Sequence, residues 1–208
     1  MFAAVGFEGS RLQQIAAAAG VSEALIYRHF PSKTALYRAV LRALVEEQNR
    51  AFDEVEDLKP SAAGLVQMLR QVFELSLRGA GAPNAEALRV LFASLAGDGG
   101  HARLAFRRAM RHARPAMEKA LAAARASGEV SGEEIDAANA VGFIAQVALT
   151  TQISRASARP VISYSDDGAA LVCQGVWFCG RGLGLTEAAL ERHYPRAAER
   201  PRLRPEPR

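Results

Sequence analysis

The segment "IAAAAGVSEALIYRHFPSK", Ile15–Lys33, decides the fold expected for the N-terminal region. A helix over residues 11–18, with Ser10 as its N-cap, is predicted to end at Gly20, because glycine readily adopts the left-handed conformation that terminates helices. Ser22 is a typical N-cap for a second helix, and Ile26 and Phe30 lie four residues apart on its apolar face. Two short helices joined by a tight glycine turn form a helix-turn-helix arrangement.

The outer side of the second helix carries polar and aromatic side chains. If Ile26 and Phe30 face inward, its other side chains are free to contact phosphates or base edges. Lys33 follows at the start of the next helix, where its charge and the free N–H groups favour an anion. Any amphipathic helical hairpin has a polar face, but the joint pattern favours DNA binding. The predicted DNA-contacting residues are Arg11, Ser22, Glu23, Ala24, Tyr27, Arg28, His29 and Lys33.

The longer stretch "GFEGSRLQQIAAAAGVSEALIYRHFPSKTALYRAV" resembles the tetracycline-repressor (TetR) family of bacterial regulators. The resemblance is specific over about residues 1–45 and elsewhere extends only to the helical layout and the length. It implies that Lys33 binds phosphate, and that Gly20, Ile26 and Phe30 are structural. It also implies contact with DNA at Ser22, Glu23, Ala24, Tyr27 and His29.

This chain departs from the family pattern at several places. Arg11 stands where the family often has a threonine, and Leu25 replaces another common threonine. Glu23 places an acid where a lysine or a neutral residue is frequent, which should lower non-specific DNA affinity. The family's first helix and its basic lead-in normally precede the segment matched here by "MFAAVGF", so either this start lies inside the true reading frame or the first helix is truncated.

The composition predicts an all-α protein. The 208 residues are 50% hydrophobic, with 26 basic and 22 acidic residues and a net charge of +4. Apolar residues recur at helical spacing along most of the chain, and β-branched runs are scarce. We expect a helix-turn-helix domain at 1–45, an effector-binding and dimerisation domain at 46–186, and a flexible tail at 187–208.

Several other classes of protein lack support in the sequence. Cys173 and Cys179 match neither a redox pair nor a zinc site, and no metal or cofactor is predicted. The most apolar run is interrupted by Asn139 and Gln146, so a cytoplasmic location is expected. Because GxSxG, P-loop, HExxH and ExxH motifs are absent, we predict that the protein is not an enzyme.

Methionine and aromatic residues in the larger region are candidates for an effector pocket, since they adapt to apolar ligands. Arginines recur along one face of the segment 103–114. They form either a solvated face, which is the commoner situation, or a basic mouth for an amphipathic anion such as a fatty acyl thioester. The predicted ligand-binding residues are Met68, Phe73, Phe92, Phe106, Arg107, Met110, Arg111, Met117 and Phe143.

Small residues at helical spacing near residue 140 predict a close helix contact. Combined with the last long apolar helix, they indicate a dimeric four-helix bundle, with packing inside one chain as the alternative. The predicted interface residues are Ala138, Gly142, Ala145, Leu149, Gly175, Trp177 and Phe178.

The sequence as a whole predicts a ligand-responsive transcriptional regulator, a repressor that binds palindromic operator DNA as a homodimer. The expected partners are double-stranded DNA and an amphipathic or anionic small molecule, with no membrane. One alternative is a dimeric small-molecule-binding protein that has lost DNA binding, and a more remote one is an unrecognised helical enzyme.

Overall fold

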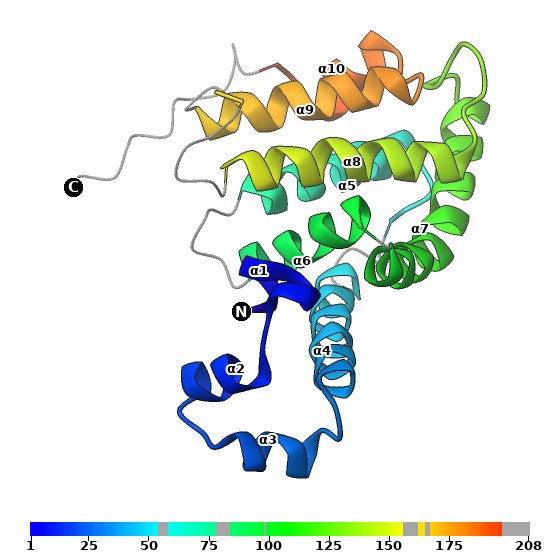
Figure 1. Ribbon diagram of the computed structural model, residues 1–208. Coiled ribbons are helices and arrows are strands. Elements are labelled where there is room, and N and C mark those ends of the chain that lie inside the picture. The colour runs from blue at the N-terminus through cyan, green and yellow to red at the C-terminus, as the bar shows by residue number, and fades with distance from the viewer. Residues whose placement is uncertain (54–57, 78–83, 98, 156–161, 165–166, 197–208) are drawn as a thin grey trace. The chain divides into compact units, whose positions relative to one another are not determined.

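The computed structural model describes residues 1–53, 58–77, 84–97, 99–155, 162–164 and 167–196 (Figure 1). Within these residues the fold is all-α, as predicted, and its one β-type contact is an isolated bridge between Val130 and Leu185. The helices are α1 (Phe2–Gly9), α2 (Leu12–Ala19), α3 (Glu23–His29), α4 (Lys33–Asp53), α5 (Ala62–Leu77), α6 (Asn84–Ala96), α7 (Gly100–Ala126), α8 (Ala137–Arg155), α9 (Gly168–Gly182) and α10 (Glu187–His193).

The chain divides into two compact units. Unit 1 comprises Met1–Glu54 and Gly81–Arg111, and unit 2 comprises Val55–Ala80 and His112–Arg208. This division differs from the functional domains expected at 1–45 and 46–186, because α6 and the start of α7 group with the N-terminal helices. The functional division remains a prediction.

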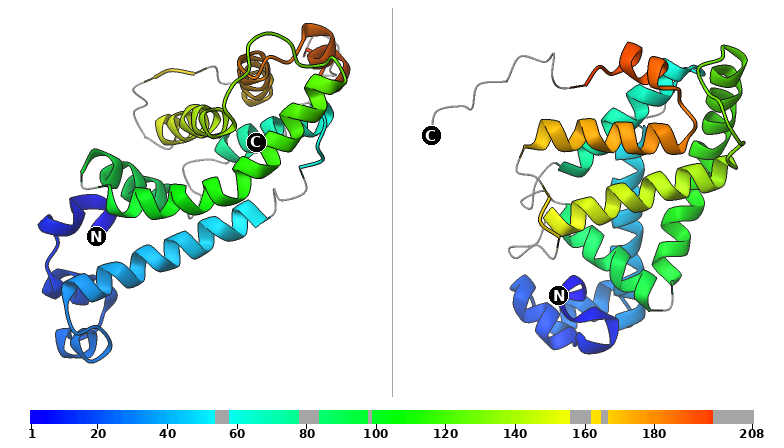
Figure 2. Two further views of the ribbon diagram at one scale, coloured as in Figure 1. Left: turned by 90° about the vertical axis from the view of Figure 1, so that its right-hand side faces the viewer. Right: turned by 90° about the horizontal axis from the view of Figure 1, so that it is seen from above.

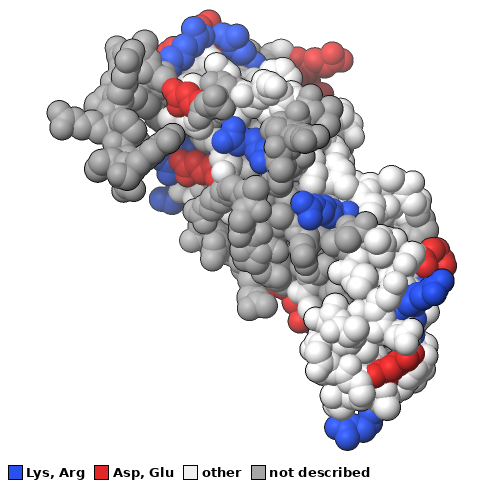
Figure 3. All heavy atoms as spheres, turned by 60° about the vertical axis from the view of Figure 1, so that its left-hand side comes forward, with Lys and Arg blue, Asp and Glu red and all other residues white. Residues whose placement is uncertain are grey.

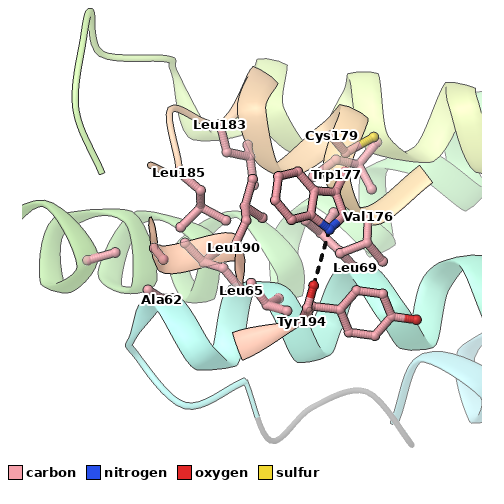
Figure 4. Close-up of a cluster of buried hydrophobic side chains, with 14 of the residues drawn as sticks. Ala62, Leu65, Leu69, Val176, Trp177, Cys179, Leu183, Leu185, Leu190 and Tyr194 are labelled. Atoms are coloured by element: carbon pink, nitrogen blue, oxygen red, sulfur yellow. Dashed lines mark hydrogen bonds between the residues drawn. The ribbon is translucent and has the colours of Figure 1, made fainter. Parts of the chain in front are cut away.

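Unit 2 is organised around α5, which packs against α8, α9 and α10 (Figure 2). Leu65, Leu69, Val176 and Leu190 are at most 2% exposed and form the centre of its core (Figure 4). Burial of such side chains stabilises a fold by about 1.5–3 kcal/mol each. Since α5, α9 and α10 all contribute side chains, the core fixes these three helices together.

The end of the described chain is attached to α9 through Trp177. The buried indole Nε1 donates a hydrogen bond of 3.1 Å to the Tyr194 carbonyl, as Figure 4 shows. The Arg196 guanidinium lies 4.0 Å from the centroid of the indole ring and forms an ion pair of 2.6 Å with Glu187. Residues 187–196 are therefore part of the ordered core, in contrast to the tail predicted there, whereas residues 197–208 lie outside the described part.

Close packing of α9 on α5 requires a glycine at position 175. A Cβ atom placed on Gly175 would lie 2.7 Å from the Phe73 ring. We therefore expect Gly175→Ala to destabilise the protein by about 1–3 kcal/mol, because overpacking forces the ring or the helix to move. Gly182→Ala is the matched control, since a Cβ there meets no atom within 4 Å. Urea unfolding should show a loss of stability for Gly175→Ala only. Equal unfolding midpoints for the two variants would contradict this packing.

Glu129 connects the turn after α7 to α10. Its carboxylate lies 2.8 Å from both Arg192 Nη1 and His193 Nε2, and its backbone carbonyl accepts from the Thr186 amide at 2.9 Å. The hydrogen bond with His193 is the main cause that lowers the pKa of Glu129, with smaller contributions from Ser127 and Arg192, and burial opposes the shift. A lowered pKa means that the carboxylate contributes stability above its ordinary pKa, and that this stability is lost as the pH falls through the folded-state pKa.

Glu129→Gln should therefore reduce the free energy of unfolding by about 1 kcal/mol at neutral pH, since the charge-assisted bonds are lost. The difference from the wild type should shrink as the pH is lowered below the ordinary carboxyl pKa of 4.5. Glu134→Gln is the control, because that side chain is 81% exposed in its ion pair with Arg125. Unfolding curves with an equal deficit at acid and neutral pH would show that Glu129 acts by packing alone.

Candidate nucleic-acid interface

A small apolar core holds α2 and α3 together. Leu12, Ala16 and Ile26 are buried, and Ile15, Phe30 and Leu36 pack against them. These positions include the inward-facing pair Ile26 and Phe30, so the predicted orientation of α3 is confirmed.

The turn between the two helices has the predicted chemistry. Gly20 adopts φ 66° and ψ 29°, the left-handed conformation that closes a helix, and its amide donates back to the carbonyls of Ala16 and Ala17. Ser22 is the N-cap of α3, and its hydroxyl oxygen accepts a hydrogen bond of 3.1 Å from the Leu25 amide. Ser22 therefore positions the start of α3 whether or not it contacts DNA.

The segment before α2 differs from the prediction. Ser10 does not cap α2: its hydroxyl donates to the Phe7 carbonyl at 2.9 Å, the N-cap is Arg11, and the helix begins at Leu12. The first helix, expected to be truncated, spans eight residues and is interrupted at Gly6, where φ is 71°. The phenyl rings of Phe2 and Phe7 each lie 5.0 Å from the ring of Tyr37, centroid to centroid, and so pack α1 on α4.

Lys33 is half-buried and has partners within the chain. Its ammonium donates to the Ser10 carbonyl at 2.9 Å and lies 4.3 Å from the centroid of the Phe7 ring. The ammonium group has three donors, so two remain for an anion. Lys33 thus holds the junction of α1 and α2 to the start of α4, in addition to the predicted phosphate contact.

The remaining predicted DNA-contacting side chains lie on the surface. Glu23, Ala24, Tyr27, Arg28 and His29 of α3 are exposed, and Tyr27 is 50% exposed. An open hollow of about 470 Å³ lies beside them. It is lined by Ser10, Arg11, Leu12, Gln13, Glu23, Tyr27 and Lys33. The structure therefore brings together Arg11, Glu23, Tyr27 and Lys33, which the sequence separates by up to 22 positions.

The charge on this part of the molecule is modest. Residues 1–45 carry five basic and two acidic residues. Toward the bottom of Figure 3, where the N-terminal helices lie, charged groups of both signs are separated by uncharged atoms. Such a surface favours binding that depends on specific contacts over binding that depends on net charge.

The predicted ligand-binding residues fall into both units. Phe73 and Met117 are 2% and 3% exposed in the core of unit 2, and Met68 packs against that core. In unit 1, Phe92, Phe106 and Met110 are half-buried, whereas Arg107 and Arg111 are exposed. Phe143 is 63% exposed and so does not lie in an interior pocket. The ligand-binding role of this set remains a prediction.

The surface of α8 and α9 contains a hollow with a volume of about 1290 Å³. Phe143 of α8 and Phe178 of α9 both line it and are 63% and 70% exposed. The hollow is predominantly apolar, and Arg181, Glu187 and Arg196 stand at its charged part.

The side of α8 that lines this hollow differs from the side that carries the small residues. Phe143, Gln146 and Val147 line it, whereas the predicted Ala138, Gly142, Ala145 and Leu149 are partly buried and do not. On α9, Trp177 and Phe178 line the hollow, and Gly175 faces Phe73 inside the chain. The dimer interface predicted from the small residues remains a prediction.

An all-α scaffold with an exposed second helix after a glycine turn defines a helix-turn-helix protein. Within the described residues, no helix is both long and apolar enough to cross a membrane.

Comparison with known proteins shows which regulators this chain resembles. Residues 1–40 match the bacterial regulatory proteins of the tetR family. The HTH-type transcriptional regulator RutR of Escherichia coli K12 is 44% identical over 78 residues, which are 36% of this chain and 35% of RutR, and RutR of Shigella flexneri matches equally. The ketosteroid transcriptional regulator KstR2 of Mycobacterium tuberculosis shares the fold, with a TM-score of 0.59, 18% identity, and coverage of 89% of this chain and 90% of that one. Residues 1–40 thus resemble the N-terminal region of TetR-family regulators, and the fold as a whole resembles that of KstR2. The sequence match spans about a third of the length of these curated relatives.

Proposed function

We propose that this protein is a ligand-responsive transcriptional regulator, a repressor that binds palindromic operator DNA as a homodimer. The observation that carries the proposal is the outward face of α3, on which Glu23, Tyr27 and Arg28 are exposed while Ile26 anchors the helix in its core. A helix held in this way can enter the major groove, where base edges present a distinct pattern for each base pair.

Roles within this face follow from side-chain chemistry. Arg11 and Lys33 flank the hollow beside α3 and supply cationic donors for phosphate oxygens. Glu23 is the first residue of α3, and its carboxylate can accept a hydrogen bond from a cytosine amino group. Glu23 therefore selects sequence, whereas Arg11 and Lys33 contribute affinity for any duplex.

The hollow on α8 and α9 supports self-association. A monomer that exposes Phe143 and Phe178 beside an apolar hollow leaves a surface that a second copy would remove from water. Most of the lining side chains are uncharged, so two copies related by a twofold axis can meet there with little repulsion between like charges.

Release of the operator DNA on binding of a small molecule would follow from a two-state equilibrium of the protein. A ligand that favours one separation of the two reading helices over another changes their fit to successive major grooves, which are about 34–36 Å apart. The effector is a small molecule, and the amphipathic anion suggested by Arg107 and Arg111 remains a candidate class.

Selection of duplexes from a random pool tests this function. The full chain should enrich a palindrome whose half-sites are separated by about one helical turn or a multiple of it. Recovery of unrelated sequences after repeated rounds, with no duplex bound at low salt, would favour a ligand-binding protein without DNA-binding activity.

A further inference from the structure

The turn between α6 and α7 in unit 1 is held by one serine. The buried Ser94 hydroxyl accepts hydrogen bonds from the amides of His101 and Ala102, both at 3.1 Å. The Ser94 carbonyl accepts from the Gly99 amide at 2.8 Å, and Gly99 adopts a left-handed φ of 70°. These bonds fix the backbone of the first turn of α7, and with it the position of His101.

The imidazole of His101 is buried without full hydrogen bonding. His101 is only 4% exposed, and its Nδ1 has no hydrogen-bond partner among the described residues. A buried polar atom left in this state costs about 1–3 kcal/mol. An imidazolium would be less favourable still, because it adds a charge and makes both ring nitrogens donors.

Charged neighbours do not compensate for this burial. Burial alone lowers the pKa of His101 from its ordinary value of 6.5, with no contribution from a charged side chain of the described residues. Exposed charged residues occur on each of the other long elements of unit 1 and on α1. They are Glu8 of α1, Arg38, Arg42 and Glu46 of α4, and Arg89 of α6, and α7 itself carries the exposed Arg103, Arg107 and Arg111.

Contacts within unit 1 connect this turn to the DNA-reading face. Helix α6, which carries Ser94, packs against α1. On α1, the Phe7 ring contacts both Tyr37 and the Lys33 ammonium, and Lys33 also binds the Ser10 carbonyl just before α2. A shift of the α6–α7 turn can therefore reach α2 and α3 through packed side chains.

We propose that His101 is a proton sensor: its protonation displaces the first turn of α7 from the core of unit 1 and weakens DNA binding in acid. The inference rests on the proposed DNA-binding function and adds the proton as a regulator of it. An exposed imidazole has an ordinary pKa of 6.5, whereas burial lowers the pKa of His101 in the closed form. Each pH unit below that value therefore favours the opened form by up to about tenfold, until the closed form also titrates.

The test is the pH dependence of operator affinity. The Kd of the full chain for its selected operator would be measured at fixed ionic strength from pH 7.5 to pH 5.5. We expect the wild-type Kd to rise by up to about tenfold on acidification. The Kd of His101→Leu, which keeps a similar volume without a titrating group, should change by less than about twofold. His29→Gln is the control for titration on the reading helix itself, and it should retain the wild-type response to acid.

The outcomes separate this inference from the function on which it rests. If the wild type binds no duplex at pH 7.5, the proposed function fails. If it binds and its affinity does not depend on pH, or if His101→Leu responds to acid as the wild type does, the proton-sensor role is overturned. Should His101→Leu not fold, as judged by circular dichroism, His101→Gln takes its place with the same expectation.

Discussion

Replacing Phe178 by glutamate is expected to convert the protein from a dimer into a monomer. Phe178 is 70% exposed in the single chain, so the substitution disturbs little within the monomer. In the proposed dimer the new carboxylate would be enclosed in the apolar hollow beside Phe143, where an unpaired charge costs several kcal/mol. Sedimentation velocity at micromolar concentrations should show the loss of the dimer, and thermal unfolding should show that the variant still folds.

Leu104→Glu is the matched control for this variant. Leu104 is 53% exposed on α7 and does not line the hollow, so the same change of charge there should leave the dimer intact. An unchanged dimer for Phe178→Glu would refute the assignment of the α8 and α9 surface as the interface.

Tyr27→Glu should have the largest effect on DNA binding. Tyr27 is half exposed on α3 and lines the same hollow as Arg11 and Lys33. A carboxylate at this position would lie against the phosphate backbone and would partly neutralise both cations. We expect a loss of affinity on the order of 100-fold for operator and random duplex alike, with less loss in high salt, because the added repulsion is electrostatic.

Tyr27→Phe separates the contribution of the ring to DNA binding from that of the hydroxyl. The ring should keep its contact with the backbone, so the variant should lose only about 1 kcal/mol if the hydroxyl donates to a phosphate. Fluorescence anisotropy with both duplexes measures the two variants together. Equal affinity of Tyr27→Glu and the wild type would mean that this face of α3 does not meet DNA.

The helix-turn-helix formed by α2 and α3 was predictable because its sequence signals are local. Gly20 ends α2, Ser22 caps α3, and Ile26 with Phe30 sets the buried side, and the structure has all three features. Each depends on residues within about one helical turn. The bond from Lys33 to the Ser10 carbonyl spans 23 positions and has no such local signal. Ser10 was wrongly expected to cap α2, because its hydroxyl instead donates to the Phe7 carbonyl.

The hollow on α8 and α9 could not be predicted from the sequence, for a physical reason. Apolar residues surround α8 on most sides, so the sequence does not show which side meets the core and which meets another chain. The small residues Gly142 and Ala145 suggested one side, but Phe143 and Val147 line the hollow. Gly175 was assigned to the interface because it is small, whereas it is small because Phe73 lies against it.

The missing hydrogen bond at Nδ1 of His101 could not be predicted from the sequence either. A histidine on the buried side of a helix has the same sequence pattern whether or not its ring is hydrogen bonded. Only the structure distinguishes the two cases. Ser94 binds the backbone amide of His101, and the imidazole Nδ1 has no partner among the described residues. The proton-sensor proposal therefore depends on the fold and not on a motif.

The most direct measurement of the central claim is a titration of the full chain into its selected palindrome, a single half-site and a scrambled duplex at several salt concentrations. A dimeric regulator should bind the palindrome more tightly than either of the others by a factor on the order of 10³, and affinity for all three should fall as salt rises. Equal affinity for the three duplexes, or binding to none of them at low salt, would contradict the account.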